Sequence, residues 1–272
     1  MTDIDFSTDE TLSTESMVRN TLAGEMPTMP QPEDDVVTLP RGRFLNGKWE
    51  RAFQVRELTG KDEEYLARKR DSMDYFDAVL SLGVTRVGDT DMQALNMAER
   101  ESILSMLLAG ERELLFLTII RVTFGNERDL EYQCIECENK YTTTLLLDHD
   151  FPLVDDLGEN PPTSYRFTTS KGDDIDYRLV TGADQRSATA NKTATLAEQN
   201  SAILHNVIQL VNGDYPVDKE AYVLGLSMRD RRDLVDALDK HQPKIDNELD
   251  LDCSACGTTN KVFLNWGDLF RP

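Results

Sequence analysis

The chain has few positive charges for its size. Its 272 residues include 29 Lys and Arg against 50 Asp and Glu, which gives a formal net charge of −21 at pH 7. Nucleic acids and anionic membrane surfaces attract proteins of the opposite sign, so this composition disfavours both as partners. The excess of acid suits a solvated surface that resists self-association, and it also suits docking onto a basic partner.

Long apolar runs are also missing. The longest apolar stretch, Leu114 to Ile120, is far too short to cross a bilayer. The first residues, Met1 to Phe6, are acidic and no apolar run follows them, so we expect neither a signal peptide nor membrane insertion. Aromatic residues make up only 7% of the chain, but hydrophobic residues reach 39%, which is enough for a real core.

Recognisable catalytic motifs are absent from the sequence. The three histidines, His149, His205 and His241, are widely spread, and none lies near a Ser or Cys in a nucleophile motif. There is no glycine loop of the type that holds phosphates. We therefore expect no catalytic residue and no site for an organic cofactor. His205 lies in an apolar helical stretch, where we expect a core or boundary residue.

Cysteine is rare, and its arrangement is informative. The four cysteines form two Cys-x-x-Cys pairs, Cys134/Cys137 and Cys253/Cys256. They are too few for a secreted disulfide framework and suit a reducing compartment. Two such pairs can supply four sulfurs to one tetrahedral ion, so we predict a structural zinc site, with one Zn²⁺ per chain. A redox dithiol, an iron–sulfur cluster and the absence of any metal remain alternatives.

The sequence around the two pairs repeats. Alternating acidic and apolar residues precede each pair, and an Asn-Lys dipeptide and an apolar strand follow it (Asn139-Lys140 and Asn260-Lys261). Two strand–turn–strand units that face each other form a zinc ribbon. Here we expect the ribbon to be split by an insertion of a hairpin and helices at about residues 151–242, so that it ties the end of the chain to its middle.

The sequence of the amino-terminal part of the chain predicts three structural elements. Residues 1–35 carry nine acids and one base, which favours a disordered or extended arm. A hairpin should span Val36 to Glu57, because Asn46-Gly47 between apolar residues is a strong turn signal. A single helix should begin at Thr59, with Asp62 completing its cap, and end at Gly83.

Helical and strand signals then alternate. Asn96 and Glu99 should cap a further helix, Gly110 should interrupt it, and the segment from Glu111 to Val122 should be the most buried helix. The later elements are predicted as follows: strands at Leu130–Gln133 and Tyr141–Leu147, a hairpin over Tyr165–Val180, a helical block over Ala183–Val211 with Leu196, Ile203, Val207 and Leu210 as its core stripe, a helix over Val217–Gly225, a helix from Ser227 to about Lys240, and strands at Leu249–Asp252 and Lys261–Trp266.

These patterns together predict an α+β protein, with helical segments around small antiparallel hairpins and a discontinuous zinc ribbon. The predicted units are the arm at 1–35, a hairpin and helical domain at 36–128, and the split ribbon at 129–272.

The order of several motifs resembles the T4-type bacteriophage baseplate protein family. The motifs are Leu39-Pro-Arg-Gly-Arg-Phe44, Val55-Arg-Glu-Leu-Thr-Gly-Lys-Asp-Glu-Glu64, Leu107-Leu-Ala-Gly-Glu-Arg112, Leu114-Leu115, Arg121 and Phe124-Gly-Asn126. The resemblance covers roughly Thr38 to Leu147 and the carboxy-terminal cysteine pair. Two departures are Ile135 and Ser254, at positions where the family often has proline after the first cysteine.

The resemblance implies a non-enzymatic hub component or assembly chaperone of a phage tail. Its partners would be hub, tape-measure or wedge proteins, and it would act in the host cytoplasm during assembly or within the tail baseplate of the virion. From the residues alone, two alternatives stay open. One is a cellular zinc-ribbon adaptor that binds other proteins, and the other is a metal-dependent enzyme.

Overall fold

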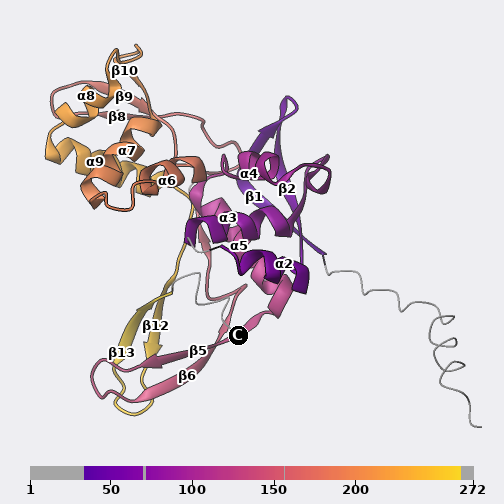
Figure 1. Cartoon of the computed structure of the whole chain (residues 1–272). Coiled ribbons are helices and arrows are strands. Elements are labelled where there is room, and N and C mark those ends of the chain that lie inside the picture. Colours follow the sequence, from indigo (N-terminus) through magenta and orange to yellow (C-terminus); the bar gives the residue numbers. More distant parts are fainter. Residues whose placement is uncertain (1–33, 70–71, 156, 265–272) are drawn as a thin grey trace, which may run out of the picture. The chain divides into compact units, whose positions relative to one another are not determined.

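The computed structural model describes residues 34–69, 72–155 and 157–264. The predicted arm therefore lies almost entirely outside the described residues, as does Trp266. Within the described ranges the chain forms eight α-helices and several small antiparallel sheets, which confirms the α+β class (Figure 1). The boundaries predicted at residues 36–128 and 129–272 stay a prediction.

The amino-terminal hairpin has the predicted position. Strands β1 (Asp34–Leu45) and β2 (Lys48–Arg56) pair around Asn46 and Gly47, whose φ angles of 50° and 84° are those that a tight hairpin turn requires. Strands β3 (Val84–Val87) and β4 (Thr90–Asp91) extend the hairpin to a four-stranded antiparallel sheet.

A bulge in β1 attaches this sheet to a helix. The strand register shifts between Thr38 and Arg43. At Gly42 a Cβ atom would lie 2.2 Å from the carbonyl oxygen of Glu50, so only glycine fits. The buried carboxylate of Glu111 accepts hydrogen bonds from the backbone N–H groups of Arg41 and Gly42, at 2.6 and 2.7 Å. Glu111 thus fixes the bulge against its helix, α5 (Ala109–Phe124).

The single helix predicted between Thr59 and Gly83 is wrong: two helices form instead, α2 (Gly60–Leu66) and α3 (Ser72–Gly83). The cap at the start is confirmed, because Thr59 and Asp62 form a capping box. No large apolar residue stands between Leu66 and Met73, and most residues between them are charged. A helix through this stretch would have no apolar face to pack against the core.

Helix α5 is the most buried helix, as predicted. It follows the short η1 helix (Met92–Ala94) and α4 (Met97–Leu104), whose predicted Asn96–Glu99 capping box is confirmed. Nine residues of α5 are buried. Gly110 does not interrupt this helix, because it lies inside its first turn. Its lack of a side chain admits the backbone of Pro243 and Lys244, which a Cβ atom would approach to 2.0 and 2.7 Å.

Gly110→Ala should therefore destabilise the protein by about 1–3 kcal/mol, since a rigid backbone would have to move away from the new methyl group. Urea unfolding checks this. Gly60→Ala is the matched control, because Gly60 starts α2 and has no atom within 4 Å of its Cβ position. We expect this control to stabilise the fold by about 0.4–1 kcal/mol, since alanine restricts the unfolded chain. Equal midpoints for the two variants would contradict the packing argument.

The insertion contains the predicted hairpin and a mixture of helices. Strands β8 (Tyr165–Thr168) and β9 (Asp174–Tyr177) pair as predicted. The helices that follow are α6 (Gly182–Thr189), α7 (Leu196–Val207), α8 (Lys219–Gly225) and α9 (Met228–His241). Ser227 caps α9 through Asp230, also as predicted.

Three predictions for the helical block are wrong. Residues Ile208–Val211 form strand β10 beside β9, because an Asn-Gly turn with positive φ angles follows and the β-branched ends suit a strand. Leu196 starts α7 and is 73% exposed, so it does not belong to the core stripe. His205 is exposed, since it lies on the solvent side of α7 beside the buried Leu204.

Two large apolar clusters fill the interior. The first combines β1–β3, α3 and α5 with residues from much later in the chain, including Ile245, Leu249 and Leu264. The second gathers β9, β10, α7, α8 and α9 around Tyr177 and Leu204. The two-residue strands β7 (Leu153–Val154) and β11 (Lys244–Ile245) pair and flank the insertion, so its two ends lie together.

A buried ion cluster connects three helices. Arg112 of α5 is 2% exposed and pairs with Asp77 of α3, which also pairs with Arg186 of α6. The Arg112 guanidinium lies 5.1 Å from the ring centre of Phe76. Gly182, the first residue of α6, gives this guanidinium room, because a Cβ atom there would lie 2.0 Å from Arg112 Nη1.

Candidate metal centre

Two hairpins of the same construction carry the cysteines. Strands β5 (Glu127–Gln133) and β6 (Lys140–Leu146) flank the first pair, and β12 (Glu248–Asp252) and β13 (Thr259–Phe263) flank the second. The two hairpins lie side by side (Figure 1), and the Tyr132 hydroxyl donates to the carbonyl of Asp252 at 3.3 Å. The facing strand–turn–strand units match the predicted ribbon.

The two cysteine turns have the same backbone hydrogen bonds. The N–H of Cys134 donates to the carbonyl of Asn139 at 2.9 Å, and Cys253 donates to Thr258 at the same distance. The residue after each second cysteine, Glu138 or Gly257, has a positive φ of 59° or 75°. A common geometry thus presents each pair of sulfurs from the same side of its turn.

The structure brings the four predicted cysteines together. All four Sγ atoms lie within 4.8 Å of one another, although the pairs stand 116 or more positions apart in the chain. Across the hairpins, the Sγ atoms of Cys134 and Cys256 lie 3.7 Å apart, and those of Cys137 and Cys253 lie 3.5 Å apart. A tetrahedral zinc ion with Zn–S bonds of about 2.3 Å needs sulfurs about 3.8 Å apart, so the set fits such an ion.

The electrostatics of the cluster favour a cation among the sulfurs. Burial opposes ionisation of Cys253, but the Tyr141 hydroxyl and the backbone N–H groups of Cys256 and Ala255 outweigh it and lower its pKa to about 6. At Cys137 a backbone N–H favours the thiolate, but desolvation and the three neighbouring sulfurs prevail and raise the pKa to about 11. Four crowded thiols cannot all ionise without a compensating positive charge.

Two residues that the sequence analysis missed connect the hairpins. The Tyr141 hydroxyl lies 2.7 Å from Cys253 Sγ and accepts the Ala255 N–H at 3.1 Å. In the reverse direction, Asn260 Oδ1 accepts the Ile135 N–H at 2.9 Å. Tyr141 and Asn260 each stand seven positions after the first cysteine of their own pair. Each unit therefore reaches across to the turn of the other from the same position.

The Asn-Lys echo of the sequence does not mark equivalent residues. Asn139 stands five positions after its cysteine and is exposed, whereas Asn260 stands seven positions after its own and is 1% exposed. Aligning the two units on their first cysteines, rather than on the Asn-Lys dipeptides, is the signal that could have identified Tyr141 and Asn260.

Asn260→Ala should destabilise the protein by about 1–3 kcal/mol and speed metal loss to a chelator. The substitution leaves the Ile135 N–H and the carbonyls of Leu251 and Thr258, to which Asn260 Nδ2 donates, without this partner. Urea unfolding and a colorimetric zinc-release assay measure the two effects. Asn139→Ala, on the exposed dipeptide, should change stability by less than about 0.5 kcal/mol. Equal effects of the two changes would contradict the inference that Asn260 connects the two hairpins.

The surface beside the cysteines is acidic. Exposed carboxylates alternate along the outer faces of both hairpins, at Glu127, Asp129 and Glu131 of β5 and at Asp250 and Asp252 of β12. The sign of these side chains would repel a phosphate backbone.

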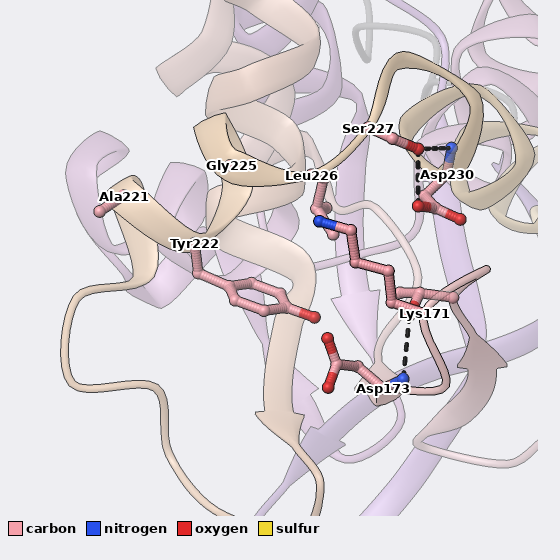
Figure 2. Close-up of a pocket in the computed structure, with 9 residues that line it drawn as sticks. Lys171, Asp173, Ala221, Tyr222, Gly225, Leu226, Ser227 and Asp230 are labelled. Carbon is pink, nitrogen blue, oxygen red and sulfur yellow. Dashed lines mark hydrogen bonds between the residues drawn. The ribbon is translucent and has the colours of Figure 1, made fainter.

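A separate hollow of about 280 Å³ lies between the β8–β9 turn and the α8–α9 connection (Figure 2). Its lining residues are Thr169, Lys171, Asp173, Ala221, Tyr222, Gly225, Leu226, Ser227 and Asp230. The Asp230 carboxylate accepts hydrogen bonds from the N–H and hydroxyl of Ser170 and from the Ser227 hydroxyl, at 2.7, 2.9 and 2.6 Å. It thus holds the turn against the start of α9, where Ser227 is the capping residue. The lining includes neither a histidine nor a cysteine.

The histidines do not meet at a site. The exposed His149 pairs with Asp150 at 2.9 Å, and His241 stacks on Tyr165 with ring centres 4.7 Å apart. In the part of the chain that the structure describes, the four cysteines are the one group of His, Cys, Asp and Glu side chains close enough to share an ion. No described helix is long and apolar enough to cross a membrane.

Comparison with known proteins places the chain in a family. No curated protein and no solved structure gave a significant match. A family described as T4 bacteriophage base plate protein matches residues 47–271, which include β2, α5, the insertion and both cysteine pairs. Because this match covers most of the sequence, the chain belongs to the T4 bacteriophage base plate protein family.

Proposed function

We propose that the protein is a structural component of the hub region of a phage tail baseplate, held in shape by one Zn²⁺ on Cys134, Cys137, Cys253 and Cys256. The observation that carries this proposal is the meeting of four sulfurs from two distant turns, in a chain of a baseplate family. Four sulfur ligands leave a tetrahedral ion no open position, so the ion would serve structure and not catalysis.

The position of the ion in the chain explains what it would do. It would join the β5–β6 hairpin to the β12–β13 hairpin. The insertion follows the first hairpin in the chain and precedes the second. Residues of both hairpins, Leu145 and Leu249 among them, pack into the first apolar cluster. The ion would therefore fix the base of the insertion while leaving the exposed surfaces available for hub, tape-measure or wedge proteins.

A permanent component and a departing assembly chaperone differ in one observable. We expect the protein to accumulate in the host cytoplasm during assembly and to remain in the finished tail. Mass spectrometry of purified particles tests this, together with electron microscopy of particles made without the gene. Its presence in particles and the loss of complete tails without it would support the proposal. If tails assemble normally without the gene, the proposal is wrong. If tail assembly needs the gene but the protein is absent from purified particles, the protein is an assembly chaperone.

A further inference from the structure

An aromatic pair lies exposed near the tip of the β1–β2 hairpin. Phe44 and Trp49 stand opposite each other in the strand register, and their rings meet edge to face with centroids 5.6 Å apart. Phe44 is 48% exposed and Trp49 41%, although the chain has only two tryptophans. The tight Asn46-Gly47 turn fixes the position of both rings, so the pair is presented to solvent in a defined geometry.

Two arginines next to this pair in the chain, Arg41 and Arg43, form no ion pair with any residue that the structure describes. The Arg41 guanidinium lies 5.3 Å from the Trp49 ring centre. The Nε and Nη1 atoms of Arg41 and the Nε atom of Arg43 are buried and have no hydrogen-bond partner in the described part of the chain.

The Glu111 carboxylate does not serve as an ion-pair partner for these arginines. Glu111 attracts Arg41, but its oxygens accept the backbone N–H groups of Arg41, Gly42 and Leu108. Burial lowers the pKa of both arginines, which reflects the cost of desolvating their charge. A partly buried guanidinium that forms no ion pair is unfavourable, and a partner that supplied a carboxylate would stabilise its charge on binding.

We propose that this hairpin patch, defined as Arg41, Arg43, Phe44 and Trp49, docks an acidic segment of another baseplate protein. Carboxylates of the segment face the two guanidinium groups, and an apolar side chain covers the aromatic pair. The inference rests on the proposed function, because it takes the partner from the baseplate. Tryptophan and arginine are the residues most enriched among those that dominate binding energy at interfaces.

Charge complementarity selects an acidic occupant even though the whole chain is acidic. Charges beyond about 8–10 Å are screened at physiological salt, so the local sign at the patch decides which segment binds. The neighbouring Lys48 is already paired with Glu50 and Asp89, and Arg51 donates to the carbonyls of Leu39 and Glu159. The unpaired positive charge is therefore concentrated on Arg41 and Arg43.

The test places a photo-crosslinking benzoylphenylalanine at position 44 of the full chain, supplied to cells infected with phage lacking the gene. Tyr215, an aromatic residue that is 82% exposed and remote in sequence, is the matched control position. We expect position 44 to cross-link to a segment of a different baseplate protein with at least two Asp or Glu near an apolar residue. Adding Arg41→Gln and Arg43→Gln should lower the yield at least about tenfold.

Four results would overturn the inference: cross-links only to a second copy of this chain, a captured segment without carboxylates, a yield unaffected by the arginine changes, or the same segment captured from position 215. Melting temperature and metal content show whether the arginine variant folds. If the arginine variant does not fold, the test is a pull-down of the partner protein that the cross-link identified. Phe44→Ser alone must then lower the amount of that partner captured. Wild-type chain that fails to restore tails would refute the proposed function, whereas normal tails from Phe44→Ser would refute only the inference.

Discussion

Cys253→Ser will abolish stable metal binding and lower the free energy of unfolding by several kcal/mol. Cys253 is buried, and its sulfur lies 3.5 Å from that of Cys137. The substitution leaves three sulfurs and replaces the sulfur that contacts the Tyr141 hydroxyl. Structural zinc contributes apparent binding energies of about 10–16 kcal/mol in small zinc domains, and that binding energy is folding energy. Losing even part of this binding energy should lower the free energy of unfolding by more than an ordinary surface substitution does.

The measurement is zinc per chain by mass spectrometry, together with urea unfolding with and without a chelator. Wild-type protein should carry one zinc ion and lose stability when chelator is present, while Cys253→Ser should be insensitive to chelator. Ser254→Ala is the control in the same turn. Its side chain is exposed, so its effect should stay within about 0.5 kcal/mol. Full zinc occupancy in Cys253→Ser, or none in the wild type, would refute the assignment of the site.

Asp77→Ala should destabilise the protein by about 3–5 kcal/mol, because it removes the counter-ion of the buried Arg112. Burial lowers the pKa of Arg112 to about 10, so its guanidinium stays charged at neutral pH and cannot escape the cost by losing a proton. The same change also removes one partner of Arg186, but this side chain is 44% exposed and lies 3.9 Å from the Asp74 carboxylate as well. Nearly all of the loss should therefore come from Arg112.

Two variants separate the buried pair from its exposed neighbour in urea unfolding. Arg186→Gln should cost at most about 1 kcal/mol, because the Arg186 side chain is 44% exposed and Asp77 keeps its buried partner Arg112. Asp77→Leu combined with Arg112→Met removes both charges and should recover most of the stability that Asp77→Ala loses. If the double variant were no more stable than Asp77→Ala, shape rather than charge would explain the cluster.

Local chemistry made several elements predictable. The Asn46-Gly47 turn and the capping boxes at Thr59 and Asn96 depend on residues within a few positions of one another, so the sequence specifies them without the rest of the fold. The predictions that failed depended on distant partners. Residues Ile208–Val211 continue an apolar helical stripe, but pairing with β9 makes them a strand. The role of Gly110 depends on Pro243, which lies far away in the chain.

The metal centre divides in the same way. The spacing of four cysteines predicted which side chains would cluster, and the order of short motifs indicated the family, because a turn that presents two sulfurs is a local structure. That the two turns meet, that Tyr141 and Asn260 cross between them, and that guanidinium nitrogens of Arg41 and Arg43 are buried without a hydrogen-bond partner among the described residues are properties of the tertiary structure alone. Such contacts join residues distant along the chain, and the packing of the whole core sets their distances and burial.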